Sequence, residues 1–197
     1  MLMVTGFATL GYLAARTYRD APPIPGRVVD PAGATLFTGQ DIIAGQQVFL
    51  SHGLMENGTI WGHGAYLGPD FSGEYLHSLA LDVRGSFSTS THPDLGTSQQ
   101  DYEGSLDAAV AQTLKENRYD SSSGTLRFTR VEADSFRTQQ QKWRDYFSAP
   151  DRNGGLTAGL IQDSDQLRKL TAFFAWAAWA SAARRPGKVY SYTNNFP

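Results

Sequence analysis

The stretch from Ile60 to Asp70 constrains the fold of this chain more than any other. It contains three glycines and a proline, together with Trp61 and Tyr66. Glycine adopts backbone conformations that are closed to other residues, and it lets the backbone approach another group closely. We therefore predict an ordered loop that presents backbone oxygens and is covered by aromatic rings. Because glycine-rich turns are common, a purely structural turn is the alternative.

The chain has 197 residues and no cysteine. Disulfides, zinc thiolate sites and cysteine nucleophiles are therefore excluded, and so is covalent haem c, which needs the two thiols of a Cys-x-x-Cys-His motif. A net charge of −2 gives no reason to expect the basic face that nucleic acid requires. The length is sufficient for one sizeable core.

The first fifteen residues are uncharged and mainly apolar, and Arg16, Arg19 and Asp20 follow them. Fifteen helical residues span roughly 22 Å, which is shorter than the ~30 Å hydrocarbon core of a bilayer. We expect residues 1–20 to be the outer part of a transmembrane helix, completed by residues upstream, and the proline-rich residues 21–37 to be a connection. A signal-peptide remnant and a buried core helix are the alternatives.

Hydrophobic periodicity predicts a mainly helical domain. Thr38 and Asp41 have the spacing of a capping box for a helix that Gly53 closes. Residues 125–131 alternate as in a short strand, whose partner the sequence does not identify. A loop is expected at residues 86–100, and further helices are expected at residues 72–85, 105–117 and 134–147 and from residue 164 onward.

The last of these helices is strongly apolar. Residues 170–183 carry no charge and include two phenylalanines and two tryptophans. Fourteen residues are too few to span a bilayer. We expect this segment to lie at the membrane surface, to be buried against a partner, or to be a packed core helix.

Several parts of the sequence resemble a known family. Residues 62–66, followed by Pro69 and Asp70, resemble the loop after the haem-attachment motif in the cytochrome c subunit of bacterial nitric oxide reductases. The similarity continues through residues 39–50 and 53–58 and through the terminal residues 185–197, which contain a Ser-Tyr-Thr-Asn-Asn run. At the family's positions for the two cysteines and the histidine, this chain has Leu54, Asn57 and Gly58.

The chain is therefore similar to the haem-less cytochrome-c-like domain that is fused ahead of the catalytic subunit in quinol-dependent nitric oxide reductases. The resemblance implies a mainly α, cytochrome-c-like helical domain with a short strand at residues 38–160, lying on the periplasmic face of the bacterial inner membrane. Residues 161–197 would be an apolar helix and a connection towards a membrane bundle. The complete enzyme would reduce two nitric oxide molecules to nitrous oxide with electrons from quinol.

The same resemblance implies where the cofactors lie. Haem b, haem b3 and non-haem iron are expected in the membrane bundle, and this chain alone is expected to bind none of them and to be inactive. A calcium ion that bridges haem propionates would take the carbonyl of Gly64 and the side chain or carbonyl of Tyr66. Calcium needs six to eight oxygens, so this chain alone should bind it weakly or not at all.

The expected partners are the membrane bundle of the same enzyme, the membrane and its quinol, with no nucleic acid. A homodimer is left open. Two other functions are compatible with the sequence. One is a membrane-anchored, non-enzymatic binding or scaffold module, and the other is a redox carrier with non-covalent haem. The second is disfavoured because no histidine pair is placed to supply axial ligands.

The histidines, His52, His63, His77 and His92, lack the spacing of a metal site. We expect His63 to face solvent, or to hydrogen-bond a propionate or part of a quinol site, rather than to bind a metal. Met55 is expected to be a core side chain rather than a haem ligand.

One pair of carboxylates has helical spacing. Asp70 and Glu74 lie four residues apart, as an acid–base pair can. Acidic residues are also favoured at helix N-termini, where they face the positive end of the helix dipole. We expect the second role.

Overall fold

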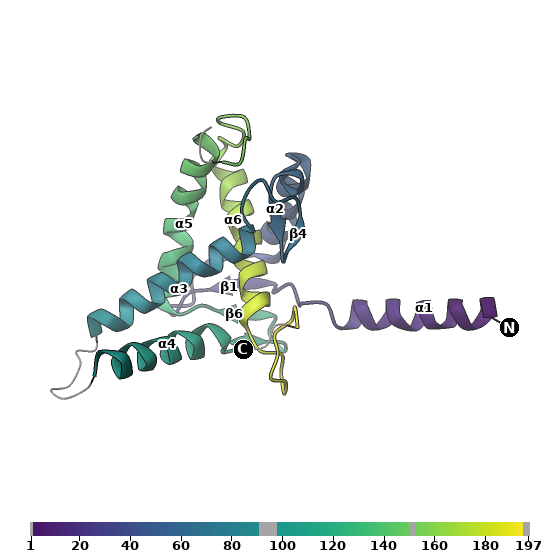
Figure 1. Cartoon of the computed structure of the whole chain (residues 1–197), viewed down its shortest axis with the longest axis horizontal. Coiled ribbons are helices and arrows are strands. Elements are labelled where there is room, and N and C mark those ends of the chain that lie inside the picture. The colour runs from purple at the N-terminus through teal and green to yellow at the C-terminus, as the bar shows by residue number, and fades with distance from the viewer. Residues whose placement is uncertain (1, 91–97, 150–152, 195–197) are drawn as a thin grey trace.

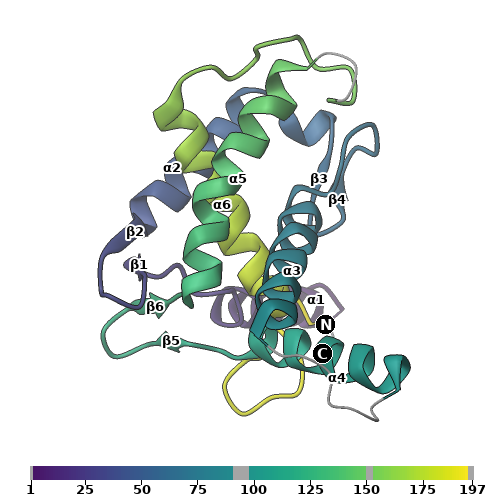
Figure 2. The same ribbon diagram turned by 90° about the vertical axis from the view of Figure 1, so that its left-hand side faces the viewer.

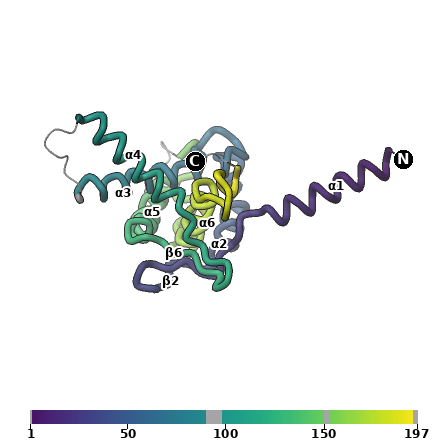
Figure 3. Tube along the Cα trace, turned by 90° about the horizontal axis from the view of Figure 1, so that it is seen from below, coloured from purple at the N-terminus to yellow at the C-terminus, as the bar shows by residue number. Residues whose placement is uncertain are grey.

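The computed structural model describes residues 2–90, 98–149 and 153–194. This part of the chain is mainly helical, as predicted, and Figure 1 shows a packed body from which α1 (Leu2–Arg19) projects. α3 (Phe71–Ser90) and α4 (Gln99–Lys115) pack against each other and project from the other side of the body (Figures 1 and 3).

The first helix has no buried side chain, and its exposed residues include Leu2, Phe7 and Leu10. None of the helices in the described ranges is both long enough and apolar enough to cross a membrane. The prolines that follow α1 lie on the body. Pro25 is buried, and the indole Nε1 of Trp176 donates a hydrogen bond of 2.9 Å to the carbonyl of Pro23.

α6 (Ser164–Ala182) is the centre of the core. It lies among α2 (Gly39–Ser51), α3 and α5 (Arg130–Ser148) (Figure 2). Every residue from Leu170 to Ala180 is buried. Of the three environments expected for the apolar segment, the structure therefore has the packed core helix.

α2 and α6 approach each other most closely at Gly45. A Cβ atom at this position would overlap the carbonyl oxygen of Lys169 and lie 2.9 Å from the Cβ of Phe173. One turn further along α2, Phe49 contacts the rings of Phe173 and Phe174, with centroids 5.7 and 6.2 Å away. The missing side chain of Gly45 thus allows the two helices to interlock.

Aromatic rings fill the space between α6 and the helices around it. Phe71 stacks on Phe174 with centroids 4.9 Å apart and an interplanar angle of 8°. Trp143 packs edge-on against Phe174, also at 4.9 Å, and Phe147 lies 6.5 Å from Phe71. These rings come from three different helices, so one cluster joins α3, α5 and α6.

A small mixed sheet lies beside the helices in the order β2–β1–β6–β5. β1 (Arg27–Val29) pairs antiparallel with β2 (Thr35–Thr38) and parallel with β6 (Thr125–Arg127), and β6 pairs antiparallel with β5 (Tyr119–Asp120). The strand predicted at residues 125–131 therefore finds its partners in β1 and β5. β1 and most of β2 lie within residues 21–37, which the sequence indicated only as a connection.

Side-chain caps fix where the helices begin. Thr38 and Asp41 form the predicted capping box of α2, and Gly53 follows that helix in a left-handed conformation with φ of 63°. Thr129 and Glu132 form a second capping box, which was not predicted. It starts α5 four residues earlier than predicted and ends the strand before it.

The prediction for residues 86–100 is wrong at both ends. α3 continues through Gly85 to Ser90, because a single exposed glycine costs a helix only about 1 kcal/mol. α4 begins at Gln99, where Ser98 accepts a hydrogen bond from the backbone of Asp101. Residues 91–97, with His92, lie outside the described residues.

Replacing Gly45 with alanine should destabilise the domain by about 2 kcal/mol or more, because backbone rather than a flexible side chain opposes the added methyl group. Urea unfolding followed by circular dichroism measures this change. Gly85→Ala is the matched control, because nothing lies within 4 Å of a Cβ there. It should be neutral or stabilise by up to about 1 kcal/mol. Equal effects of the two substitutions would contradict this account of the helix contact.

Candidate functional site

The glycine-rich loop is a short hairpin that extends from the core. After the 3-10 turn Leu54–Glu56, β3 (Thr59–Ile60) pairs with β4 (His63–Gly64). Trp61 and Gly62 connect them with φ values of 55° and 77°, as in the tight turns that join antiparallel strands.

A positive φ is unfavourable for a tryptophan, and contacts of Trp61 with the core oppose that cost. Its indole Nε1 donates a hydrogen bond of 2.8 Å to the carbonyl of Ala177 in α6, and its ring lies 5.5 Å from Trp176. The hairpin is thereby held against the core helix.

Asp70, the last residue of the loop, stabilises the loop by accepting four hydrogen bonds. One carboxylate oxygen accepts hydrogen bonds from the Thr59 hydroxyl at 2.7 Å and from the Gly62 amide at 2.6 Å. The other accepts from the Ser72 hydroxyl at 2.5 Å and from the Gly73 amide at 2.7 Å. One side chain therefore joins the hairpin to the first turn of α3.

These hydrogen bonds also set the ionisation of Asp70. Partial burial alone would raise the pKa of this carboxyl, but the four donors favour the charged form and together hold the pKa below its ordinary value. The carboxylate is thus charged at neutral pH and fully engaged within the protein.

Asn57 closes the base of the loop. Its buried side-chain amide donates to the carbonyls of Asn153 and Gly154, at 3.2 and 2.9 Å. Its own backbone carbonyl accepts hydrogen bonds from the amides of Leu67 and Gly68. Asparagine thus performs a structural role at the position where the family resemblance would place a cysteine.

The other two replaced positions are also part of the packing. Leu54 is fully buried. A Cβ atom at Gly58 would overlap the carbonyl oxygen of Pro69 and lie 2.7 Å from the ring of Phe71. At Gly58, where the family resemblance places the haem-ligating histidine, this fold has no space for a side chain. Met55, which we expected in the core, is instead 43% exposed.

The family resemblance assigns Gly64 and Tyr66 to a calcium site. Both residues are exposed on the hairpin. Tyr66 is 84% exposed, and its hydroxyl makes one long hydrogen bond, 3.4 Å, to the carbonyl of Gly62. The neighbouring carboxylate of Asp70 already accepts four hydrogen bonds. The loop therefore fits a calcium ion only as a contributor of a few oxygens, because calcium takes six to eight.

The remaining candidates do not converge on a metal or acid–base site. His63 and His77 are exposed, and His52 Nδ1 lies 2.9 Å from the Val48 carbonyl at the end of α2. Glu74 forms an ion pair with Lys142, away from Asp70. In the described ranges, no group of three or more histidine, aspartate or glutamate side chains could hold a metal ion.

A groove of about 650 Å³ brings together two segments that are far apart in the sequence. Trp61, His63 and Asp70 line it from the loop, and Tyr192 and Asn194 line it from the segment after α6. Both segments carry the family resemblance, but sequence separation gave no sign that they share a surface. Residues 195–197 lie outside the described residues.

At the positions where the family resemblance places haem attachment, this helical domain has packed residues and no cysteine, so covalent haem c cannot be attached there. A family model described as the NorB cytochrome c-like domain of nitric oxide reductase matches residues 25–197, and the chain belongs to this family. It is accordingly a domain of a nitric oxide reductase, an oxidoreductase. No curated protein matches the chain.

Replacing Asp70 with asparagine should destabilise the domain by about 2 kcal/mol, because an amide cannot accept from all four donors and places its own NH2 group against one of them. Asp134→Asn is the control, since Asp134 is exposed and its ion pairs among the described residues are with Arg130 and Arg137 of its own helix. Asp134→Asn should change the free energy of unfolding by no more than about 0.5 kcal/mol. Chemical unfolding at neutral pH measures both values, and equal losses would contradict the role of Asp70.

The pH dependence provides a second readout of the same carboxylate. Because the pKa of Asp70 is lower in the folded than in the unfolded protein, its stabilising contribution is complete above the unfolded pKa of about 3.9. The contribution is lost as the pH falls through the folded pKa. The stability difference between the native protein and Asp70→Asn should therefore be constant above about pH 5 and narrow below pH 4. A constant difference across this range would contradict the prediction.

Proposed function

We propose that this chain is the haem-less N-terminal domain of a quinol-dependent nitric oxide reductase and covers the enzyme's catalytic membrane bundle on the periplasmic face of the bacterial inner membrane. The complete enzyme reduces two nitric oxide molecules to nitrous oxide. The observation that carries the proposal is the combination of the family match with the replaced and packed haem-attachment positions.

The route of the electrons follows from those positions. A cytochrome c relay needs a covalently held haem, and this chain has neither the thiols nor space for a ligand at Gly58. Electrons from a soluble donor therefore have no carrier in this domain. A quinol dissolved in the membrane reaches the bundle without passing through the domain, which supports quinol as the donor.

The reaction centre belongs to the bundle in this proposal. The carboxylates and histidines near the loop are exposed, ion-paired or used in the hydrogen bonds of Asp70. We assign haem b, haem b3 and non-haem iron to the bundle and no catalytic group to residues 2–90, 98–149 and 153–194. The domain's role is to cover and support the bundle.

Exposed apolar surface supports a position at the membrane. Leu2, Met3 and Phe7 of α1 are 68–92% exposed, and exposing this much apolar side-chain surface to water is unfavourable. We assign α1 as the outer part of a membrane anchor. The segment after α6 leads towards the bundle.

The hairpin contributes to the bundle through its exposed oxygens. We assign the carbonyl of Gly64 and the phenol oxygen of Tyr66 to a calcium site that the bundle completes. The exposure of Tyr66 and its single long hydrogen bond leave that oxygen accessible to a partner. Bound calcium would supply positive charge next to the haem propionates.

Donor specificity tests the proposed function in the full-length reductase. Nitric oxide consumption, followed with an electrode, should be supported by a reduced quinol and not by reduced soluble cytochrome c. The 197-residue chain alone should show no consumption with either donor. Turnover with cytochrome c at the rate seen with quinol would overturn the proposal, and so would turnover by the isolated chain.

Tyr66→Phe should lower the calcium content of the full-length reductase, measured by elemental analysis after dialysis against limiting calcium. The reason is the loss of one oxygen ligand from a site that needs six to eight. Tyr18→Phe is the control, because Tyr18 is equally exposed, at 85%, but lies in α1. Unchanged calcium content in Tyr66→Phe would contradict the assignment of the phenol oxygen.

A further inference from the structure

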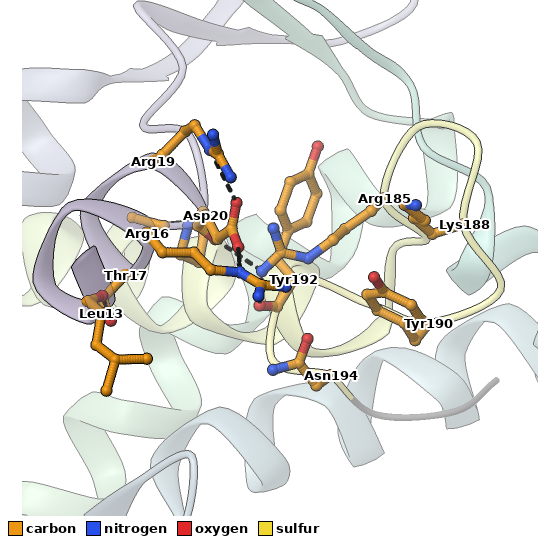
Figure 4. Close-up of a pocket in the computed structure, with 12 residues that line it drawn as sticks. Leu13, Arg16, Thr17, Arg19, Asp20, Arg185, Lys188, Tyr190, Tyr192 and Asn194 are labelled. Carbon is orange, nitrogen blue, oxygen red and sulfur yellow. Dashed lines mark hydrogen bonds and ion pairs between the residues drawn. The ribbon is translucent and has the colours of Figure 1, made fainter. Parts of the chain in front are cut away.

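A second groove, of about 780 Å³, lies where α1 meets the segment that follows α6 (Figure 4). Arg16 and Arg19 line it from the end of the helix, and Arg185 and Lys188 line it from the other segment. Asp20 is the single carboxylate among the lining residues. Four cations against one carboxylate leave a formal charge of +3.

The arrangement leaves much of this charge without an acidic partner. One carboxylate oxygen of Asp20 already lies 3.5 Å from Nε of Arg16, and the other lies 3.7 Å from Nε of Arg19. Within the described ranges, neither Arg185 nor Lys188 has a carboxylate within ion-pair distance. The groove therefore attracts an anion.

Arg185 is rigidly held, which distinguishes the groove from a set of free surface cations. Its guanidinium donates to three backbone carbonyls, those of Asp20, Ser191 and Tyr192, at 2.7, 3.1 and 2.6 Å. It also lies 5.2 Å from the ring centre of Tyr192. Carbonyl oxygens orient a guanidinium but do not cancel its charge, so Arg185 presents a fixed positive charge.

The position of the groove indicates what kind of anion it takes. It begins directly after the exposed apolar surface of α1, where Leu13 lines the groove one turn before Thr17. Tyr190 and Tyr192 in the groove add aromatic rings with polar ends. An apolar helix that ends in a groove of cations and tyrosine rings presents the groups that meet the hydrocarbon, the interface and the phosphates of a bilayer.

We propose that this groove binds the phosphate head group of an anionic phospholipid. The inference rests on the proposed position of α1 in the membrane and adds a specific lipid contact to it. Arg16, Arg19 and Lys188 would surround the phosphate, and the fixed charge of Arg185 would lie behind it. Such a contact would fix the angle between the anchor and the domain.

Vesicle flotation of the 197-residue chain tests the proposal. Binding is compared between vesicles of phosphatidylcholine alone and vesicles in which part of the phosphatidylcholine is replaced by phosphatidylglycerol, at physiological salt. The native chain should bind the anionic vesicles more tightly. Removing two groove cations with Arg19→Gln and Lys188→Gln should reduce this preference by about fivefold for each cation. Circular dichroism establishes that the variant is folded.

A matched variant separates a built site from general attraction. Arg130→Gln with Arg144→Gln removes the same charge from exposed positions outside the groove and should keep the preference. Equal losses in the two double variants would overturn the proposal. So would displacement from anionic vesicles by glycerol phosphate at matched ionic strength, because the site would then be one for free phosphate.

The two proposals fail in different ways. Absence of binding to phosphatidylcholine vesicles would overturn the assignment of α1 as an anchor. Equal binding to neutral and anionic vesicles would overturn the lipid site alone. The latter result would leave an acidic segment of the membrane bundle as the occupant of the groove.

Discussion

The close contact between α2 and α6 at Gly45 is the constraint on which the rest of this domain depends. Because no side chain separates the two backbones there, Phe49 reaches the rings of α6 and the aromatic cluster can close around Phe174. Phe71 is a member of that cluster and is also the first residue of α3, directly after Asp70. The core packing therefore fixes the position of the residue that organises the loop.

The loop leaves Tyr66 and Leu67 exposed and takes its order mainly from hydrogen bonds to this core. Asp70 joins the hairpin to α3, Asn57 closes its base, and Trp61 ties its tip to α6. The same packing leaves no space for a haem ligand at Gly58. A scaffold that resembles a haem protein thus holds an ordered, exposed loop, which agrees with the supporting rather than redox role that we propose for the domain.

Prediction from the sequence was most successful where the signal is local. The capping box at Thr38 and the start of the last helix are encoded within a few residues, and both were correct. The continuation of α3 beyond Gly85 was missed because an exposed glycine weakens a helix without ending it. The pairing of β6 with β1 was missed because β1 lies almost a hundred residues away and is only three residues long, and β5 was missed because it has only two residues.

The sequence by itself determined that no covalent haem can be attached, that the domain is mainly helical, and that residues 60–70 form a glycine-dependent loop. These three features depend only on residue chemistry and short-range geometry. Only the tertiary structure decided that Asp70 joins the loop to α3, that residues 170–180 are core, and that the end of α1 and the segment after α6 share a cationic groove. Each of these depends on which surfaces meet across long separations, and that is set by the packing of the whole core rather than by any one segment.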